Sequence, residues 1–295
     1  MRKGFHVYLR TYFQKQLKTN LIMKKLLVPT DFSEQAENAL KVAVQISKER
    51  DSEIFLLHSI ELPVQYATAR ENSGIPEPLF YMKLAKKQFH KFREKSFLKD
   101  VVVHDLVGHN EIYEEIEEAC QTHDIDLIIM GSTGASGFKE MFVGSNTEKV
   151  VRTSSTPVLV IKDRYPNFEI EDFVFATDFS EKFKNAFSQA KKVADILGAK
   201  IHLLFVNTPA EFKTTEESKS IMKNFVKEMD LTNYTLNVYN DVSVEKGILN
   251  FTKSINAQLI GMATHGRKGI SHFLNGSISE DMVNHAKIPI ITFKI

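Results

Sequence analysis

The chain repeats one stretch of sequence 147 residues later, and this repeat decides the fold. The first copy reads Leu26-Leu-Val-Pro-Thr-Asp-Phe-Ser-Glu34, and the second reads Phe173-Val-Phe-Ala-Thr-Asp-Phe-Ser-Glu181. Their last five residues are identical. Further along, Ile54-Phe-Leu-Leu-His58 matches Ile201-His-Leu-Leu-Phe205 at the same offset. Matches that keep their order and spacing indicate two copies of one structural unit.

The end of each copy carries a second pair of matches, at an offset of 132 residues. Met130-Gly-Ser-Thr-Gly134 corresponds to Met262-Ala-Thr-His-Gly266, and Gly144-Ser145 corresponds to Gly276-Ser277. The offset is smaller here because the first copy has a longer middle, around residues 62–80.

Short apolar runs alternate with helical patterns in both copies. Runs of this kind are typical of strands buried on both faces of a parallel sheet. In the first copy they are Lys25–Pro29, Glu53–Ile60, Asp100–Leu106, Asp126–Gly131 and Pro157–Ile161. The clearest helix has apolar residues three and four positions apart and ends near a capping glycine. Its residues are Phe183, Ala186, Phe187, Ala190, Val193, Ala194, Leu197 and Gly198.

This alternation predicts an α/β protein made of two tandem Rossmann-like domains. Each domain is expected to be a five-stranded parallel sheet with helices on both faces. The predicted boundaries are an N-terminal extension at 1–22, domain 1 at 23–162, a linker at 163–172 and domain 2 at 173–295. The extension has five basic and no acidic residues and is expected to be disordered.

Composition excludes several classes of protein. The 38 basic and 37 acidic residues nearly cancel, which disfavours nucleic acid and anionic membranes as partners. No apolar run approaches the roughly 20 residues that cross a bilayer. The only cysteine, Cys120, falls on the apolar side of a predicted helix, so we expect a core residue and a cytoplasmic protein. The chain has no Walker loop, no G-x-G-x-x-G after its first strand and no histidine cluster with metal-ligand spacing.

The glycine-rich segment after the fourth predicted strand is the strongest candidate for chemistry. Gly131 follows that strand directly, where a glycine permits a positive φ and a close approach to the backbone. Gly144-Ser145 opens a predicted helix, whose free amides and dipole favour an anion. A structural alternative stands beside this interpretation. Ser145 with Glu148, and Ser277 with Glu280, also fit capping boxes that would only start a helix.

The spacing Gly131-x2-Gly134-x9-Gly144-Ser145, together with Val28-Pro-Thr-Asp-Phe-Ser33, resembles the universal stress protein family. The resemblance covers residues 23–295 and implies an adenine nucleotide alpha hydrolase-like fold. It implies ATP as ligand, with Mg²⁺ bound through the phosphates. Asp31 would contact the ribose and the backbone at Ser59 the adenine. The phosphates and ribose would lie on Gly131, Gly134, Gly144 and Ser145, with Pro29, Met130, Asn146 and Thr147 nearby.

The second copy departs from this pattern. Ala263 replaces the first glycine, and Ala176 replaces Pro29. The methyl group of Ala263 is expected to hinder a ligand, so we predict a weakened or empty second site. Its residues would be Asp178, Val206, Gly266, Gly276 and Ser277, with Asp178 keeping a helix-capping role.

The favoured function is an ATP-binding stress-response protein that acts through conformation or partner binding, because no general base is evident. Two alternatives stay open. One is slow ATP hydrolysis or autophosphorylation at Ser145 or Thr147. The other is an interaction module without nucleotide, or a sensor of another nucleotide such as cyclic AMP. The resemblance also implies that Pro157–Ile161 and Pro289–Ile295 pair within one chain, while a homodimer of whole chains stays open.

Overall fold

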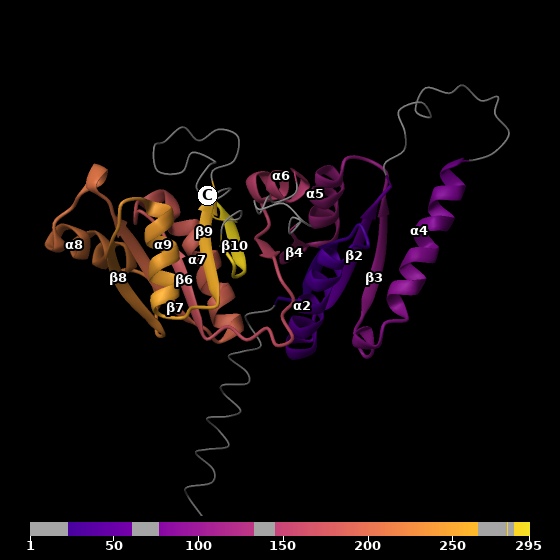
Figure 1. Cartoon of the computed structure of the whole chain (residues 1–295), viewed down its shortest axis with the longest axis horizontal. Helices are drawn as coiled ribbons and strands as arrows, with labels where there is room; N and C mark the ends of the chain where they lie inside the picture. The colour runs from indigo at the N-terminus through magenta and orange to yellow at the C-terminus, as the bar shows by residue number, and fades with distance from the viewer. Residues whose placement is uncertain (1–22, 61–76, 133–144, 265–281, 283–285) are drawn as a thin grey trace, which may run out of the picture.

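A computed structural model describes residues 23–60, 77–132, 145–264, 282 and 286–295. Within this part of the chain, the strands form one ten-stranded sheet that runs across the whole molecule (Figure 1). The strands of domain 1 are β1 (Lys25–Pro29), β2 (Glu53–Ser59), β3 (Val103–Gly108), β4 (Leu127–Gly131) and β5 (Val158–Ile161). Those of domain 2 are β6 (Asp172–Ala176), β7 (Lys200–Asn207), β8 (Tyr234–Asn240), β9 (Leu259–Thr264) and β10 (Ile290–Lys294).

The strand order confirms the two parallel halves and their pairing within one chain. The order across the sheet is β3-β2-β1-β4-β5-β10-β9-β6-β7-β8. Neighbouring strands are parallel inside each half, whereas β5 and β10 are antiparallel. At this junction Ile290 pairs with Val160 and Ile291 with Leu159. The last strand of each domain therefore joins the halves into one continuous sheet.

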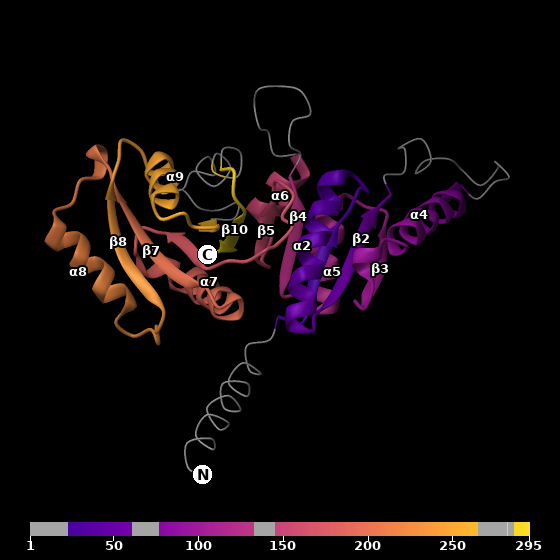
Figure 2. The same ribbon diagram turned by 60° about the horizontal axis from the view of Figure 1, so that its bottom comes forward.

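Helices cover both faces of the sheet, as Figure 2 shows. The longer helices are α2 (Glu34–Arg50), α4 (Glu77–Arg93), α5 (Ile112–His123), α6 (Ser145–Thr153), α7 (Lys184–Leu197), α8 (Thr215–Val226) and α9 (Val244–Ser254). Short 3-10 turns are η1 (Ser96–Leu98), η2 (Glu181–Phe183) and η3 (Pro209–Glu211). Helices α2, α4, α7 and α8 pack into one apolar core, and α5, α6 and α9 pack into the core on the other face.

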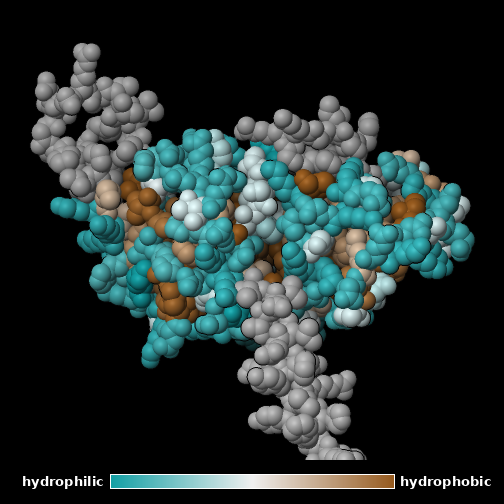
Figure 3. Space-filling model, turned by 180° about the vertical axis from the view of Figure 1, so that it is seen from behind, coloured by the Kyte–Doolittle hydropathy of each residue, from teal (hydrophilic) through white to brown (hydrophobic). Residues whose placement is uncertain are grey.

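The apolar runs become strands because both of their faces are buried. In β1, Leu26 and Val28 enter the first core and Leu27 enters the second, and all three are fully buried. Burial of each such side chain contributes about 1.5–3 kcal/mol to folding. The face seen in Figure 3 is mostly hydrophilic, with small separate apolar patches. No helix in the described residues is long and apolar enough to span a membrane.

The predicted helix of the second copy is confirmed as α7, and Gly198 ends it in the left-handed conformation with a φ of 72°. The corresponding helix of the first copy, α2, has Ser33 as its N-cap residue. Its C-cap residue is Asp51, which has a φ of 55°. Cys120 is buried in the core, as expected.

The third strand was predicted at Asp100–Leu106, but β3 begins and ends later. Asp100 has a φ of 64° and belongs to the turn that follows η1, and Val102, which is 55% exposed, lies just before the strand. Similarly, Asp126 precedes β4, because its carboxylate accepts hydrogen bonds from the amides of Lys24 and Lys25. Apolar residues alone could not separate these turns from the strands.

The segment between the two domains lies against α2. Gln45 donates a hydrogen bond to the Tyr165 carbonyl at 2.9 Å and accepts one from the Phe168 amide at 2.7 Å. The side chains of Phe168 and Ile170 are buried in the first core. This segment is therefore packed into domain 1 before β6 begins.

Candidate functional site

The turn that follows β1 is built by its own side chains. The Thr30 hydroxyl accepts a hydrogen bond from the Phe32 amide, and the Asp31 carboxylate accepts one from the Ser33 amide, both at 2.9 Å. Ser33 then accepts from Ala36 at the start of α2. Phe32 has a φ of 63°, a conformation that bulky residues rarely adopt. The turn explains why these residue types occur together.

The Phe32 ring anchors this strained turn to the neighbouring elements. Its centroid lies 4.6 Å from the His58 ring and 5.0 and 5.3 Å from Phe92 and Phe89. The His58 Nδ1 lies 2.8 Å from the carbonyl oxygen of Thr30. The end of β2 thus fixes the end of β1, and Asp31 is held at the edge of the sheet.

A cavity of about 570 Å³ lies at this edge, where β1, β2 and β4 end and α2 and α6 begin. We call it the domain 1 cavity. It is lined by Pro29, Thr30, Asp31, Ser33, Gln35, Ala36, His58, Ser59, Ile60, Ile112, Met130, Gly131, Ser145, Asn146 and Thr147. Carboxyl edges of parallel strands are the usual ligand position in sheets of this type.

The structure places eight of the ten predicted residues of the first site on this wall. They are Pro29, Asp31, Ser59, Met130, Gly131, Ser145, Asn146 and Thr147. Gly134 and Gly144 lie outside the described residues. The residues come from separate parts of the sequence, and the sheet brings them together.

Helix α6 presents its first turn to the cavity. Ser145 and Asn146 are exposed, while Thr147 is buried and donates a hydrogen bond to the Gly131 carbonyl at 3.1 Å. Because the first amides of a helix have no partner inside it, those of α6 are available to a ligand. Ser145 is the first described residue of α6. Because residue 144 lies outside the described residues, the capping box of Ser145 with Glu148 stays an alternative.

Gly131 has a packing role in addition to its place on the cavity wall. In the described residues Gly198 is the only glycine with a positive φ, so Gly131 does not need that freedom. A Cβ atom at Gly131 would lie 2.5 Å from the carbonyl oxygen of Gln35. The glycine is required because α2 packs closely against the end of β4.

Domain 2 has the same turn after β6, but a 3-10 turn follows it where domain 1 has the start of α2. Phe179 has a φ of 61°, and its amide donates to Thr177, while Asp178 accepts from the Ser180 amide at 2.8 Å. Asp178 thus stabilises the turn, and Ser180 is the residue that precedes η2. The helix-capping role expected for Asp178 is therefore wrong.

The described residues at the matching position of domain 2 line a space of only about 20 Å³. Phe183, which is 1% exposed, stands where domain 1 has Ala36. Val206 stands where domain 1 has Ser59. The described wall consists of Ala176, Thr177, Asp178, Phe183, Leu204, Val206, Val244, Ile248 and Met262. Within the described residues, large apolar side chains therefore take up space that stays open beside Ala36 and Ser59 in domain 1.

Ala263 was expected to hinder a ligand with its methyl group, and the structure shows a packing role for that group. It is buried in the core that contains α7, so its methyl group packs under the helix. Where α2 starts directly with Glu34, domain 2 has the 3-10 turn η2 before α7. The other expected residues, Gly266, Gly276 and Ser277, lie outside the described residues.

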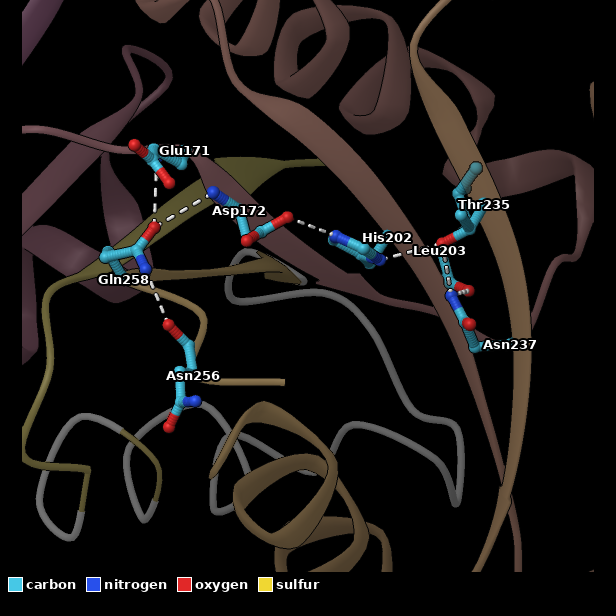
Figure 4. A network of polar contacts seen from close by, with 8 residues as sticks. All are labelled: Glu171, Asp172, His202, Leu203, Thr235, Asn237, Asn256 and Gln258. Carbon is cyan, nitrogen blue, oxygen red and sulfur yellow. Dashed lines mark hydrogen bonds and ion pairs between the residues drawn. The ribbon is translucent and has the colours of Figure 1, made fainter. Parts of the chain in front are cut away.

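A polar network at the opposite edge of domain 2 crosses three strands (Figure 4). His202 Nε2 lies 2.7 Å from the Asp172 carboxylate, and its Nδ1 lies 2.7 Å from the Thr235 hydroxyl. The chain of acid, imidazole and hydroxyl resembles a catalytic arrangement. However, Asn237 donates to the same hydroxyl, and none of the three residues lines a described cavity. The network joins β6, β7 and β8.

The predicted site left out seven residues of the domain 1 cavity wall, which are Thr30, Ser33, Gln35, Ala36, His58, Ile60 and Ile112. A signal for two of them was present in the aligned repeats. His58 is polar where its counterpart is Phe205, and Ala36 is small where its counterpart is Phe183. Pairs of aligned residues that differ in size or polarity in this way can distinguish an open site from a filled one. The structure is needed to show which of these residues face the site.

Comparisons with known proteins agree with this architecture. The universal stress protein family model matches twice, at residues 23–162 and 169–294. Universal stress protein MJ0577 of Methanocaldococcus jannaschii is 34% identical over 159 residues, which cover 48% of this chain and 97% of the relative. Universal stress protein YxiE of Bacillus subtilis is 30% identical over 148 residues, which cover 48% and 100%.

A solved structure shows the same fold over both domains. The crystal structure of a universal stress protein from Archaeoglobus fulgidus superposes with a TM-score of 0.68 at 24% identity. The superposition covers 93% of this chain and 98% of that one. The fold is that of a tandem Rossmann-like α/β protein. With two matches to the family model that together span most of its length, the chain belongs to the universal stress protein family.

Proposed function

We propose that domain 1 binds an adenine nucleotide, ATP with Mg²⁺, and that binding changes the conformation or the partners of the chain during stress. The observation that carries this proposal is the cavity of about 570 Å³ at the carboxyl edge of domain 1, where the matching described residues of domain 2 line only about 20 Å³. The larger volume lies within the range of ligand pockets. We place this function in the cytoplasm, for which a free, buried Cys120 is suited.

The sugar and base would lie on the β1 and β2 side of the cavity. Asp31 uses Oδ1 for the turn, and its Oδ2 makes no hydrogen bond within the described residues. That oxygen can accept a hydrogen bond from a ribose hydroxyl. The Ser59 hydroxyl already donates to the Asn110 carbonyl. A contact to adenine at Ser59 would therefore use the backbone.

The phosphates would lie at the start of α6. Its free amides and dipole favour negative charge, and the exposed side chains of Ser145 and Asn146 add polar groups. No group of three or more potential metal ligands occurs in the described residues. Mg²⁺ fits this site because it binds mainly through phosphate oxygens and water, and it would neutralise phosphate charge.

We favour binding of ATP without rapid hydrolysis. The titratable side chains on the described wall are Asp31 and His58, and both help to hold the turn after β1. If slow hydrolysis or autophosphorylation occurs, Ser145 is a better acceptor than Thr147, whose buried hydroxyl donates to Gly131. Cyclic AMP and a module without nucleotide are the other outcomes that an experiment must separate.

Mass spectrometry of gently purified protein and thermal unfolding with added ligand test the proposal directly. We expect co-purified ATP and a rise in the melting temperature with Mg-ATP. At a ligand concentration of 100 times Kd, the stabilisation should be about 2.7 kcal/mol. No shift at millimolar ATP, or a larger shift with cyclic AMP, would contradict the ATP assignment.

The variant Ala36→Phe tests the position of the site. It places in domain 1 the residue that closes domain 2, so ATP should no longer raise the melting temperature. Asn38→Phe adds the same ring to α2 but does not line the cavity, and its ATP response should persist. If Ala36→Phe folds and still binds ATP with unchanged affinity, the nucleotide does not occupy this cavity.

A further inference from the structure

A second large cavity lies in domain 2, away from the position of the nucleotide site. It has a volume of about 610 Å³ and lies between α8 and the carboxyl ends of β7 and β8. We call it the lysine groove. The family resemblance assigns no ligand to this groove. The residues of domain 1 at the matching position differ, as described below.

One side of the lysine groove is apolar and incompletely covered. Leu236 and Val238 alternate with other residues along β8, so both face α8. Met222 of α8 is buried beside them. Phe212, which follows η3, is 70% exposed at the rim, an unusual position for a phenyl ring. An apolar segment of a ligand would remove this surface from water.

The other side carries positive charge. Lys219 and Lys223 are one helical turn apart on α8, and Lys213 adds a third ammonium group. Lys219 and Lys223 form no ion pair with any described residue, and the described wall of the groove contains no acidic side chain. The groove therefore combines an apolar wall with a basic rim, in which Lys213 lies near the charge of Glu217 while Lys219 and Lys223 have no ion-pair partner in the described structure.

The rim is held in place by a buried amide. Asn207 accepts a hydrogen bond from the Lys213 amide at 2.9 Å and donates to the Lys213 carbonyl at 3.2 Å. It also donates to Asn240 on β8. These bonds close the segment from β7 to α8, so the lysine groove is formed before a ligand arrives.

Domain 1 has the opposite chemistry at the matching position. Asp105 of β3 corresponds to Leu236, and it pairs with Arg93 of α4 at 3.0 Å. An acid already paired with a cation would repel a negative headgroup and remove the apolar wall. The feature is thus specific to domain 2.

We propose that the lysine groove binds a free single-chain amphiphile with an anionic headgroup, of the long-chain fatty acid type. The chain lies along Leu236, Val238 and Met222, and the carboxylate lies near Lys219 and Lys223. The aliphatic stems of the lysines cover part of the chain while their ammonium groups meet the carboxylate. Domain 2 then has a ligand of its own, away from the position that matches the domain 1 cavity.

Titration of the full chain with a dansyl-labelled undecanoate tests the proposal. We expect saturable enhancement of the dansyl fluorescence at one site. Dodecanoate should displace the probe, whereas dodecanol and dodecyltrimethylammonium should not. Absence of saturation, or equal displacement by the alcohol, would overturn the anionic assignment. Binding to phosphatidylglycerol vesicles without binding to monomeric dodecanoate would assign the groove to a membrane surface and also overturn it.

Charge reversal locates the site. Replacing both Lys219→Glu and Lys223→Glu should weaken probe binding about ten-fold or more. The matched pair Lys86→Glu and Lys87→Glu, exposed on α4, should leave it unchanged. Leu236→Asp, which installs the residue type of domain 1, should also weaken it. Unchanged affinity in the α8 double variant would refute the site, and retained amphiphile binding in Ala36→Phe would separate it from the nucleotide proposal.

Discussion

Phe32 and Phe179 share a left-handed backbone conformation, with φ angles of 63° and 61°. A strained conformation of a bulky residue persists only where the surroundings hold it. In each copy the preceding threonine and aspartate provide hydrogen bonds, and aromatic rings surround the phenyl group. The identical residues therefore maintain a turn in both domains. The presence of a cavity depends on other residues, above all Ala36 and Phe183.

Lys162, at the end of β5, gives a prediction for the dependence of stability on pH. Its ammonium group is buried without a hydrogen-bond partner in the described structure, and burial lowers the pKa of Lys162 to about 8. The unfolded chain binds more protons between this value and 10.5, so stability should rise with pH across that window. Lys162→Met should be about 1–2 kcal/mol more stable than wild type at pH 7, with allowance for partial exposure, and about equal near pH 10.

Urea unfolding at the two pH values measures this difference. The exposed Lys99→Met should change stability by less than about 0.5 kcal/mol at either pH. An advantage of Lys162→Met that is the same at both values would show that the side chain is uncharged or well solvated in the folded protein.

At the scale of elements, the first turn of one helix distinguishes the two domains. Helix α2 starts directly after Ser33 and lies against Gly131, whereas α7 follows the turn η2 and covers Ala263. The connection from the first strand to the first helix therefore has a different structure in each domain. One leaves a cavity beside Ala36, and in the other the ring of Phe183 lies at the matching described position.

Gly131→Ala tests the packing of α2 on β4. Its methyl group would lie 2.5 Å from the Gln35 carbonyl oxygen, so α2 must shift. We expect a loss of about 1–3 kcal/mol in unfolding free energy. The reverse change in domain 2, Ala263→Gly, should lose stability through a missing methyl contact and not through a clash. Crystal structures of both variants would separate these causes, and an unmoved α2 in Gly131→Ala would contradict the packing argument.

At the scale of the whole molecule, β5 and β10 pair with each other and join the two domains. The free edges of the described sheet are β3 and β8. Two chains that associate further must therefore use another surface than their last strands. The contact is reinforced by Lys294, whose ammonium group donates to the Thr153 carbonyl at the end of α6. Domain 2 thus contacts the helix that faces the proposed nucleotide.

Val160→Asp tests whether the two domains depend on this junction. Val160 is fully buried on β5 and pairs with Ile290, so an unpaired charge there should destabilise both halves by about 3–5 kcal/mol. Hydrogen exchange should rise in both β1 and β6. Val242→Asp, at an exposed position of domain 2, should have little effect. Faster exchange confined to domain 1 would show that the domains unfold independently.

The sequence by itself determined the repeat, the alternation of strands and helices and the end of α7 at Gly198. These features depend on local periodicity and on residues that repeat at fixed spacing, whereas the pairing of the last strands was implied by the family resemblance. It also indicated which segments meet at the first site, because carboxyl ends of parallel strands share one edge. The start of β3, the role of Gly131 and the closure by Phe183 were decided only by the tertiary structure. Each depends on the distance between elements far apart in the chain, and one methyl or phenyl group at that distance decides whether a space is open or filled.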